Sequence, residues 1–306
     1  KLEPSRHSIG IDIGGTFTDF VAYDTGTRAL SSLKILTSPE NPDRAVFEGL
    51  EILCNSHGLQ PANAAVIIHA TTLATNTLIE GTGAKVALIT SGGFKDILEM
   101  RRETRYDDYD LTIEFPEPLV PRHHRMEVVE RVLADGTVRI SLDEAAINSL
   151  LKDLKSEEIE ALAVCLLHSW ANPQHEERIG EVAANLLPAI PVSLSCRVQP
   201  EIREFERMVT TVANAYLQPR LRRYLHDLTA GLSERGYGAP FYVMQSNGGF
   251  AGPEESALYP VRLIESGPAA GAIAAAAYAR AAGEANVVSL DMGGTTAKIA
   301  VLRDGQ

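Results

Sequence analysis

Cysteine is scarce in this 306-residue chain, and so are long apolar runs. The three cysteines, Cys54, Cys165 and Cys196, lie far apart and form no CxxC pair, which excludes a zinc ribbon and is typical of a reducing compartment. No apolar stretch approaches the roughly 20 residues that span a membrane. Residues 1–8 also lack the apolar core and the cleavage site of a signal peptide. We therefore expect a cytoplasmic protein without membrane contact.

Positive charge is the second shortage. The chain has 28 lysine and arginine residues against 40 aspartate and glutamate residues, a formal net charge of −12. This balance argues against nonspecific binding to nucleic acid or to acidic membranes. It does not exclude a nucleotide, because a phosphate pocket is built locally from backbone amides and a metal ion. The sequence has no GxxxxGK(S/T) P-loop, and no GxGxxG turn follows a predicted strand, so Walker and Rossmann sites are unsupported.

Hydrophobic periodicity predicts strands that alternate with helices, as in an α/β protein of one large or two smaller domains. Strands are expected at residues 9–13, 17–23, 32–36, 66–70, 85–90, 125–133, 161–167, 191–195, 240–245, 287–292 and 298–302. Helices are expected at residues 42–57, 92–101, 142–155, 173–187, 201–217, 219–235 and 267–283. Proline favours the first turn of a helix, so Pro219 predicts a new helix, and Ser266 is the expected N-cap of the last one.

One five-residue pattern occurs twice. Residues 12–16 read Asp-Ile-Gly-Gly-Thr and residues 291–295 read Asp-Met-Gly-Gly-Thr, which places them 291 − 12 = 279 positions apart. Each lies at a predicted hairpin turn between two strands. A single Gly-Gly turn of this kind is common in hairpins, whereas two matching copies, each ending in threonine, favour a shared function.

The residue types of this pattern suit a triphosphate and a metal ion. Paired glycines leave backbone amides open to phosphate, and the threonines add hydroxyl donors. The expected phosphate-binding residues are Gly14, Gly15, Thr16, Thr18, Gly293, Gly294, Thr295 and Thr296. Asp12 and Asp291 are the expected catalytic residues, which would hold Mg²⁺ through water or orient a reacting oxygen. The pair of hairpins resembles that of actin, Hsp70 and sugar-kinase ATPases, which have a ribonuclease H-like α/β fold with two lobes.

Longer motifs give a more specific resemblance. They are, in order, Ile9–Asp19, His69–Asn76, Arg203–Arg207 with Asn214–Leu217, Gln245–Gly249, Glu265–Gly271 and Asp291–Thr296. Together they resemble the hydantoinase A/5-oxoprolinase family across nearly the whole chain. The resemblance implies an ATP- and Mg²⁺-dependent hydrolase that opens a cyclic amide (a hydantoin, N-methylhydantoin or 5-oxoproline) after phosphorylation of the amide oxygen. It also implies a hydantoinase B-type partner subunit or domain.

Two other functions stay open. The same motifs resemble the ATP-binding subunits of acetone and acetophenone carboxylases, which form C–C bonds instead of breaking C–N bonds. A non-catalytic module that binds nucleotide and supports assembly is the alternative from another class. A sugar kinase has the hairpins but does not account for residues 69–76 or 265–271.

The family motifs also suggest residues that contact substrate. These are His69, Thr71, Thr72, Asn76 and Arg102. Each has a structural alternative: a strand-end histidine is usually packed, the threonines and asparagine suit a helix cap, and residues 101–110 suit a charged loop. Lys298 either approaches phosphate or faces solvent. Glu204 and Arg207 are three apart on a predicted helix, the spacing of a weak surface ion pair.

Domain organisation follows from the positions of the two hairpins. Residues 1–195 are expected to form an N-terminal lobe with the first hairpin, and residues 196–306 the start of a second lobe. Only 306 − 296 = 10 residues follow Thr296, whereas members of the family continue much further. We therefore expect a truncated second lobe, with the adenosine-binding segment supplied from elsewhere.

Overall fold

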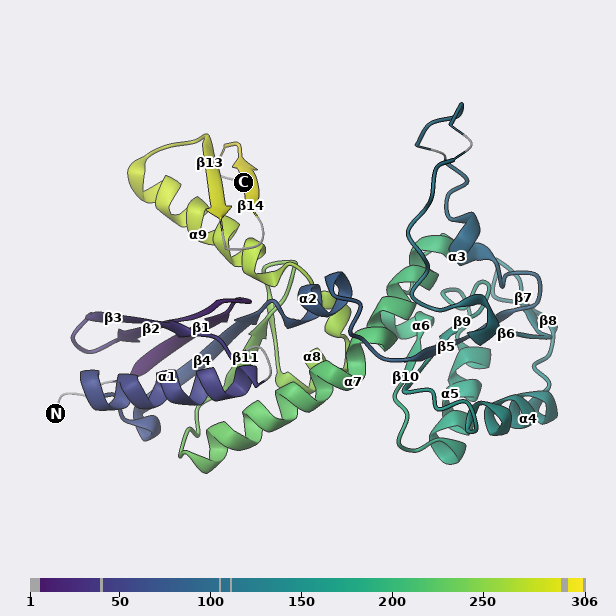
Figure 1. Ribbon diagram of the computed structural model, residues 1–306, viewed down its shortest axis with the longest axis horizontal. Coiled ribbons are helices and arrows are strands. Elements are labelled where there is room, and N and C mark those ends of the chain that lie inside the picture. Colours follow the sequence, from purple (N-terminus) through teal and green to yellow (C-terminus); the bar gives the residue numbers. More distant parts are fainter. Residues whose placement is uncertain (1–5, 39–40, 105, 111, 293–296, 305–306) are drawn as a thin grey trace. The chain divides into compact units, whose positions relative to one another are not determined.

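The chain forms an α/β structure with two compact units. A computed structural model describes residues 6–38, 41–104, 106–110, 112–292 and 297–304 (Figure 1). Unit 1 combines residues 1–82 with residues 221–306, and unit 2 comprises residues 83–220. The units therefore do not follow the linear division at residue 195 that the sequence suggests, because both ends of the chain contribute to unit 1. Within the described residues, no helix is long and apolar enough to span a membrane.

A six-stranded mixed sheet forms the centre of unit 1. Its strands are β1 (His7–Ile13), β2 (Phe17–Asp24), β3 (Leu30–Leu36), β4 (Ala64–Thr71), β11 (Phe241–Met244) and β12 (Phe250–Ala251), in the order β12-β11-β4-β1-β2-β3. The first three strands form an antiparallel meander, and β4 and β11 then add in parallel on the other side of β1. The alternation of Ile9, Ile11 and Ile13 places all three side chains in the core at 1–3% exposure.

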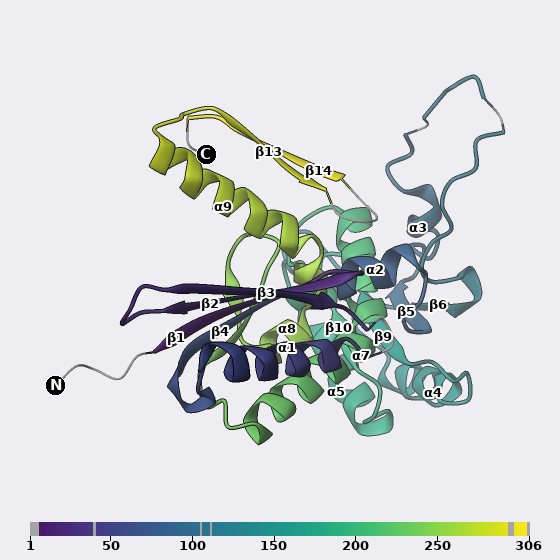
Figure 2. The same ribbon diagram turned by 60° about the vertical axis from the view of Figure 1, so that its left-hand side comes forward.

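Helices lie on both faces of this sheet (Figures 1 and 2). α1 (Pro42–His57) and the end of α7 (Glu204–Glu234) lie on one face, and α9 (Ser266–Ala282) lies over the other. α1 begins at Pro42 and ends at Gly58, which has a left-handed conformation, as the sequence predicts. Short elements complete the unit: η1 (Pro61–Asn63), α2 (Leu73–Ile79), α8 (Pro253–Leu258) and η3 (Pro260–Leu263).

A second, two-stranded sheet packs against α9. It consists of β13 (Val287–Met292) and β14 (Ala297–Leu302), which pair antiparallel so that Asp291 is opposite Lys298. These are the strands expected around the second hairpin. Gly293, Gly294, Thr295 and Thr296 lie outside the described residues, so their expected phosphate contacts stay a prediction.

Unit 2 contains a four-stranded parallel sheet in the order β10-β9-β5-β6. The strands are β5 (Val86–Ser91), β6 (Arg125–Val128), β9 (Ala161–Cys165) and β10 (Val192–Leu194), and β7 (Arg131–Val132) pairs with β8 (Val138–Ile140). The helices are α3 (Ile97–Met100), η2 (Arg122–His124), α4 (Glu144–Leu154), α5 (Gln174–Leu186), α6 (Ser195–Val198) and the first part of α7. Apolar residues of β9, α4 and α5 share one core, including Leu162, Ile147 and Ile179.

Two predictions about helices are wrong. The expected break at Pro219 does not occur, since α7 runs for 31 residues with this proline inside it. Proline removes one backbone donor and strains the preceding turn, but buried residues on both sides, such as Leu217 and Leu221, stabilise the continuous helix. The N-cap of α9 is Glu265 instead of Ser266.

Arg207 is buried, contrary to the weak surface pair expected with Glu204. Its guanidinium is 1% exposed and donates to Ser169 Oγ, to Ser195 Oγ at 2.6 Å and to the carbonyl oxygen of Leu166 at 2.8 Å. The carboxylate of Glu176, fully buried, lies 3.8 Å away. Glu176 also accepts hydrogen bonds from backbone amides at the ends of β9 and β10. This network joins α5 and α7 to the strand ends of unit 2.

Candidate functional site

The first hairpin presents Asp12 at the end of β1. Asp12 pairs in register with Asp19 on β2, and the amide of Gly14 donates to the carbonyl oxygen of Phe17 at 2.9 Å to close the turn. A Cβ atom at Gly14 would lie 3.1 Å from that same oxygen, which explains the glycine. Gly15 and Thr16 are exposed at the tip. The turn therefore leaves its backbone accessible to a ligand.

The start of α2 lies against this turn. The amide and the hydroxyl of Thr72 both donate to the carbonyl oxygen of Ile13, at 3.0 and 3.2 Å. Asn76 Nδ2 donates to Thr72 Oγ1 at 3.2 Å, and it lies 3.6 Å from the position that a Cβ atom of Gly15 would take. Two of the expected substrate residues, Thr72 and Asn76, are thus brought next to the Gly-Gly turn.

The start of α9 joins the same region. The amide of Glu265 donates to Thr75 Oγ1 on α2 at 3.2 Å, and Ser266 Oγ donates to the carbonyl oxygen of Thr71 at 3.5 Å. The carboxylate of Glu265 pairs with Lys298 Nζ on β14 at 2.9 Å. Motifs that are nearly 200 residues apart in sequence therefore meet within unit 1.

The electrostatics of the site centre on Asp12. The residue keeps contact with solvent, but surrounding protein atoms desolvate its carboxyl group and raise its pKa. The negative charges of Asp19 and Asp291 raise the pKa of Asp12 further, whereas Lys298 and Lys34 lower it. An excess of carboxylates at an open turn favours a bound cation.

A row of charges crosses the three antiparallel strands at this level. Asp12 on β1 is opposite Asp19 on β2, which in turn is opposite Lys34 on β3. Lys34 Nζ donates to both carboxylate oxygens of Asp19 at 2.7 Å. Sequence reasoning missed Asp19 and Lys34 and left Lys298 undecided. The hairpin register was the available signal, because a turn centred on Gly14-Gly15 fixes which residues face each other.

His69 does not contact the site. It is fully buried within β4, where Nε2 hydrogen-bonds to Tyr224 Oη at 2.8 Å and the imidazole packs near the ring of Phe241. Burial lowers the pKa of His69 to about 4, so the ring is neutral at physiological pH. This geometry corrects the expected substrate contact, since the ring has no access to solvent.

His69 is instead expected to make folding pH-dependent. The unfolded chain binds a proton at this histidine below pH 6.5, whereas the folded chain does so only below about 4. Stability should therefore fall as pH decreases from 6.5 to 4, by about 3 kcal/mol in total. His69→Gln keeps a hydrogen-bonding group but cannot titrate, so its denaturation midpoint should vary less over this range. His226 is exposed, so His226→Gln is the control. If the denaturation midpoint of His69→Gln changes with pH as much as that of the wild type, the assignment is contradicted.

The other expected residues are placed as follows. Thr18 is fully buried and its Oγ1 hydrogen-bonds to Thr37 Oγ1, just after β3, at 2.9 Å, which corrects the expected phosphate contact because the hydroxyl is not exposed. Thr71 is buried, and its Oγ1 accepts from the amide of Leu73 at the start of α2 at 3.1 Å, a capping role. Arg102 belongs to unit 2, where Nε pairs with Glu206 at 2.7 Å.

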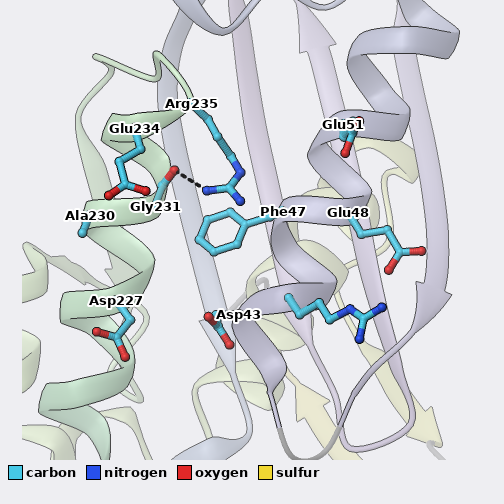
Figure 3. A pocket seen from close by; sticks show the side chains of 10 residues that line it. Asp43, Phe47, Glu48, Glu51, Asp227, Ala230, Gly231, Glu234 and Arg235 are labelled. Carbon is cyan, nitrogen blue, oxygen red and sulfur yellow. Dashed lines mark hydrogen bonds between the residues drawn. The ribbon is translucent and has the colours of Figure 1, made fainter.

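An open groove lies between α1 and α7, away from both hairpins in sequence (Figure 3). It has a volume of about 750 Å³, and its side chains include five carboxylates, those of Asp43, Glu48, Glu51, Asp227 and Glu234. Arg235 stacks over Phe47 at 3.9 Å from the ring centre, and it donates to the carbonyl oxygen of Gly231 at 2.9 Å. So acidic a surface repels a triphosphate. We therefore do not place nucleotide in this groove.

The described residues contain no cluster of three or more histidine, cysteine, aspartate or glutamate side chains suited to a metal ion. A fully protein-bound metal centre is therefore not present in the part of the chain that the structure describes. Mg²⁺ needs no such cluster, because one or two protein carboxylates suffice when water and phosphate complete its coordination.

The chain is an α/β protein whose mixed sheet in unit 1 ends in an acidic turn with two glycines, and comparison with known proteins gives its family. A family model described as the hydantoinase/oxoprolinase N-terminal region matches residues 8–187, and a hydantoinase/oxoprolinase model matches residues 207–306. The chain belongs to the hydantoinase/oxoprolinase family, which confirms the resemblance drawn from its motifs.

Several relatives are similar over nearly the whole chain. Caprolactamase subunit alpha from Pseudomonas jessenii is 36% identical over 311 residues, which cover 100% of this chain and 44% of the relative. The crystal structure of ATP-dependent caprolactamase from this organism matches with a TM-score of 0.84 at 35% identity, over 96% of this chain and 43% of that chain. The 5-oxoprolinase of Saccharomyces cerevisiae is 33% identical over 349 residues, 100% of this chain and 26% of the relative.

A structure of nucleotide-free acetone carboxylase is also similar. It matches with a TM-score of 0.89 at 28% identity, over 99% of this chain and 44% of that chain. The chain thus spans less than half the length of each of these relatives.

Proposed function

We propose that this chain carries the phosphate-binding part of an ATP-dependent enzyme that opens a cyclic amide. One observation carries the proposal: the second DxGGT segment lies beside the first, because the start of α9 hydrogen-bonds to α2 and to the end of β4, and Glu265 there pairs with Lys298, which is opposite Asp291. This contact supports a single site to which both copies of the motif contribute. Lys34 and Lys298 supply positive charge there, as a triphosphate requires.

The fold supports an ATPase of the actin, Hsp70 and sugar-kinase type. In unit 1, three antiparallel strands are followed by two parallel ones on the other side of β1, the arrangement expected for a ribonuclease H-like domain. The first hairpin joins β1 to β2, and a second hairpin region joins β13 to β14. In this proposal both turns offer backbone amides to the phosphates, through Gly14, Gly15 and Thr16 and through residues 293–296.

The acidic site fits Mg²⁺. Asp12 and Asp291 would offer carboxylate oxygens to the ion or to its bound water. Desolvation, followed by repulsion from Asp19 and Asp291, raises the pKa of Asp12, and a divalent cation would relieve that repulsion. When bound, the ion would neutralise charge on the transferring phosphoryl group. The aspartates would hold it through water, while Lys298 approaches the phosphate oxygens.

The proposed chemistry explains why ATP is needed to break an amide. An amide carbonyl is a poor electrophile, and transfer of the γ-phosphoryl group to its oxygen converts that oxygen into part of a good leaving group. ADP leaves at this transfer, and addition of one water to the carbonyl carbon followed by cleavage of the ring C–N bond gives an open-chain acyl phosphate. A second water hydrolyses the acyl phosphate to the amino acid and inorganic phosphate. Caprolactamase and 5-oxoprolinase, named among the relatives, support a cyclic amide as the substrate class.

A ketone carboxylase is the second candidate, favoured by the similarity to acetone carboxylase. It would phosphorylate an enolate or carbonate oxygen with the same site and then form a C–C bond. Subunit names among the relatives support a partner subunit for either function. The hydantoinase B type is our proposal for it. We propose the cytosol as the compartment, because the three cysteines are free and far apart in sequence.

Product analysis distinguishes the two reactions. The full-length polypeptide, purified with any subunit that accompanies it, is incubated with Mg²⁺-ATP and either a cyclic amide (caprolactam, 5-oxoproline, hydantoin) or acetone or acetophenone with bicarbonate. We expect ADP release to require the cyclic amide and to match the ring-opened amino acid one to one. ADP release that occurs only with a ketone and bicarbonate would contradict the amidohydrolase and support the carboxylase.

A further inference from the structure

Glu265 has a backbone conformation that its side chain does not favour. It lies just before α9 with φ 62° and ψ 26°, in the left-handed region that glycine adopts most readily. Its carboxylate makes no capping hydrogen bond to the helix. The helix terminus therefore gives no reason for a glutamate at this position, and strained residues of this kind cluster at functional sites.

The contacts of Glu265 connect three elements of the site. Its amide is anchored to Thr75 Oγ1 on α2 at 3.2 Å, and the neighbouring Ser266 hydroxyl reaches the end of β4. The side chain extends to β14, where it pairs with Lys298 Nζ at 2.9 Å. The left-handed backbone thus directs the carboxylate toward the second hairpin.

Lys298 is the group that this contact restrains. It is opposite Asp291 in the β13–β14 ladder, and its charge acts on Asp12 in the first hairpin. With its side chain 25% exposed, it is more enclosed than the other described lysine of the site, Lys34, at 55%. A lysine has a long, flexible stem, so its ammonium group acts on a reacting phosphate only if something fixes its position.

We propose that Glu265 is a positioning residue, which fixes the Lys298 ammonium on the strand opposite Asp291 so that it is in place when a phosphoryl group is transferred. The inference rests on the proposed ATP-dependent function and deepens it. Lys298 would contact the phosphate oxygens, whereas Glu265 would act only through Lys298. The carboxylate reaches Lys298 from the start of α9. It occupies only part of the ammonium group, which leaves the other hydrogens for phosphate.

A double-mutant cycle in the full-length enzyme with its accompanying subunit tests this role. K298M should lower kcat for ATP hydrolysis about 100-fold, as for loss of a transition-state donor. E265Q should lower kcat about 10-fold with little change in the KM for ATP, and it should have no further effect in the K298M background, because coupled residues are not additive. E255Q is the matched control, since Glu255 forms an exposed ion pair with Arg262 at 3.2 Å outside the site. It should leave kcat unchanged.

Two further measurements separate positioning from folding. E265G suits the left-handed backbone, so its melting temperature should equal or exceed that of the wild type, while its kcat falls as in E265Q. Reductive methylation of Lys298, followed by mass spectrometry, should be several-fold faster in E265Q because the ammonium group is released. If the melting temperature of E265G is lower than that of the wild type, and the methylation rate of Lys298 in E265Q is unchanged, Glu265 has a structural role and the inference is overturned.

The outcomes also separate this inference from the proposed function. If the wild type hydrolyses ATP with substrate but E265Q keeps kcat within twofold, the positioning role is overturned and the proposed function stands. If the effects of E265Q and K298M on kcat are fully additive, the positioning role is likewise overturned and the proposed function stands. A wild type that hydrolyses no ATP with any cyclic amide or ketone overturns the proposed function, and the inference with it.

Discussion

Asp12→Asn is expected to reduce substrate-dependent ATP hydrolysis by more than 100-fold. Asparagine keeps the size of the side chain but removes the charge that would hold Mg²⁺ beside Asp291, and loss of one preorganised transition-state contact usually has an effect of this size. Asp291→Asn should have a similar effect, and the double variant should be little worse than either single one, because both would serve the same ion. The measurement is steady-state ADP release by the full-length enzyme.

Glu48→Gln is the control for this prediction. Glu48 is a carboxylate of the α1–α7 groove in the same unit, so its removal changes the net charge equally without touching the hairpins. Its activity should stay within twofold of the wild type. If Asp12→Asn and Asp291→Asn also retain activity, the chain is a non-catalytic assembly module, the alternative from another class.

Arg207→Ala should destabilise unit 2 by about 3–5 kcal/mol, the scale for breaking a buried ion pair by removing one partner. The reason is that Glu176, itself fully buried, would lose the guanidinium that lies 3.8 Å away and keep only hydrogen-bond donors around its charge. Ser169, Ser195 and the carbonyl oxygen of Leu166 would lose a donor as well. Chemical denaturation followed by circular dichroism measures the change.

An exposed arginine provides the matched control. Arg178 is 45% exposed and pairs with Glu144 and Glu181 at 2.8 Å. Ion pairs on the surface contribute roughly 0–1 kcal/mol, so Arg178→Ala should cost no more than that. Similar losses of stability in the two variants would show that the Arg207 network contributes no more than a surface pair.

Much of the fold follows from local patterns in the sequence. The alternating isoleucines of β1, the glycine turn after them and the Pro-to-Gly boundaries of α1 each predict an element that the structure contains. Helix α7 could not be predicted in the same way, because tertiary packing around Pro219 overrides a local signal for a break. The division into units also needs three-dimensional contacts, since β11 pairs with β4 from a distant part of the chain.

The positions of site residues could be predicted where a sequence motif determines them, but not where they depend on tertiary packing. The position of Asp12 at an open turn, and the proximity of Thr72 and Asn76, agree with the motifs. His69 belongs to a motif as well, yet the alternation of β4 places it in the core. A motif shows that a residue matters without showing whether it binds a ligand or packs. The tip of the second hairpin, residues 293–296, stays a prediction.

The discontinuous unit 1 has a consequence for the order of events during synthesis. Residues 1–82 leave the ribosome before unit 2, but their sheet needs β11 and β12, which are made only after all of unit 2. Unit 2 is continuous in sequence and holds its own core, so it can fold while the strands that carry Asp12 still wait for partners. Pairing over such sequence separations is slow. We therefore expect the first hairpin, although made early, to become able to bind phosphate late in biogenesis.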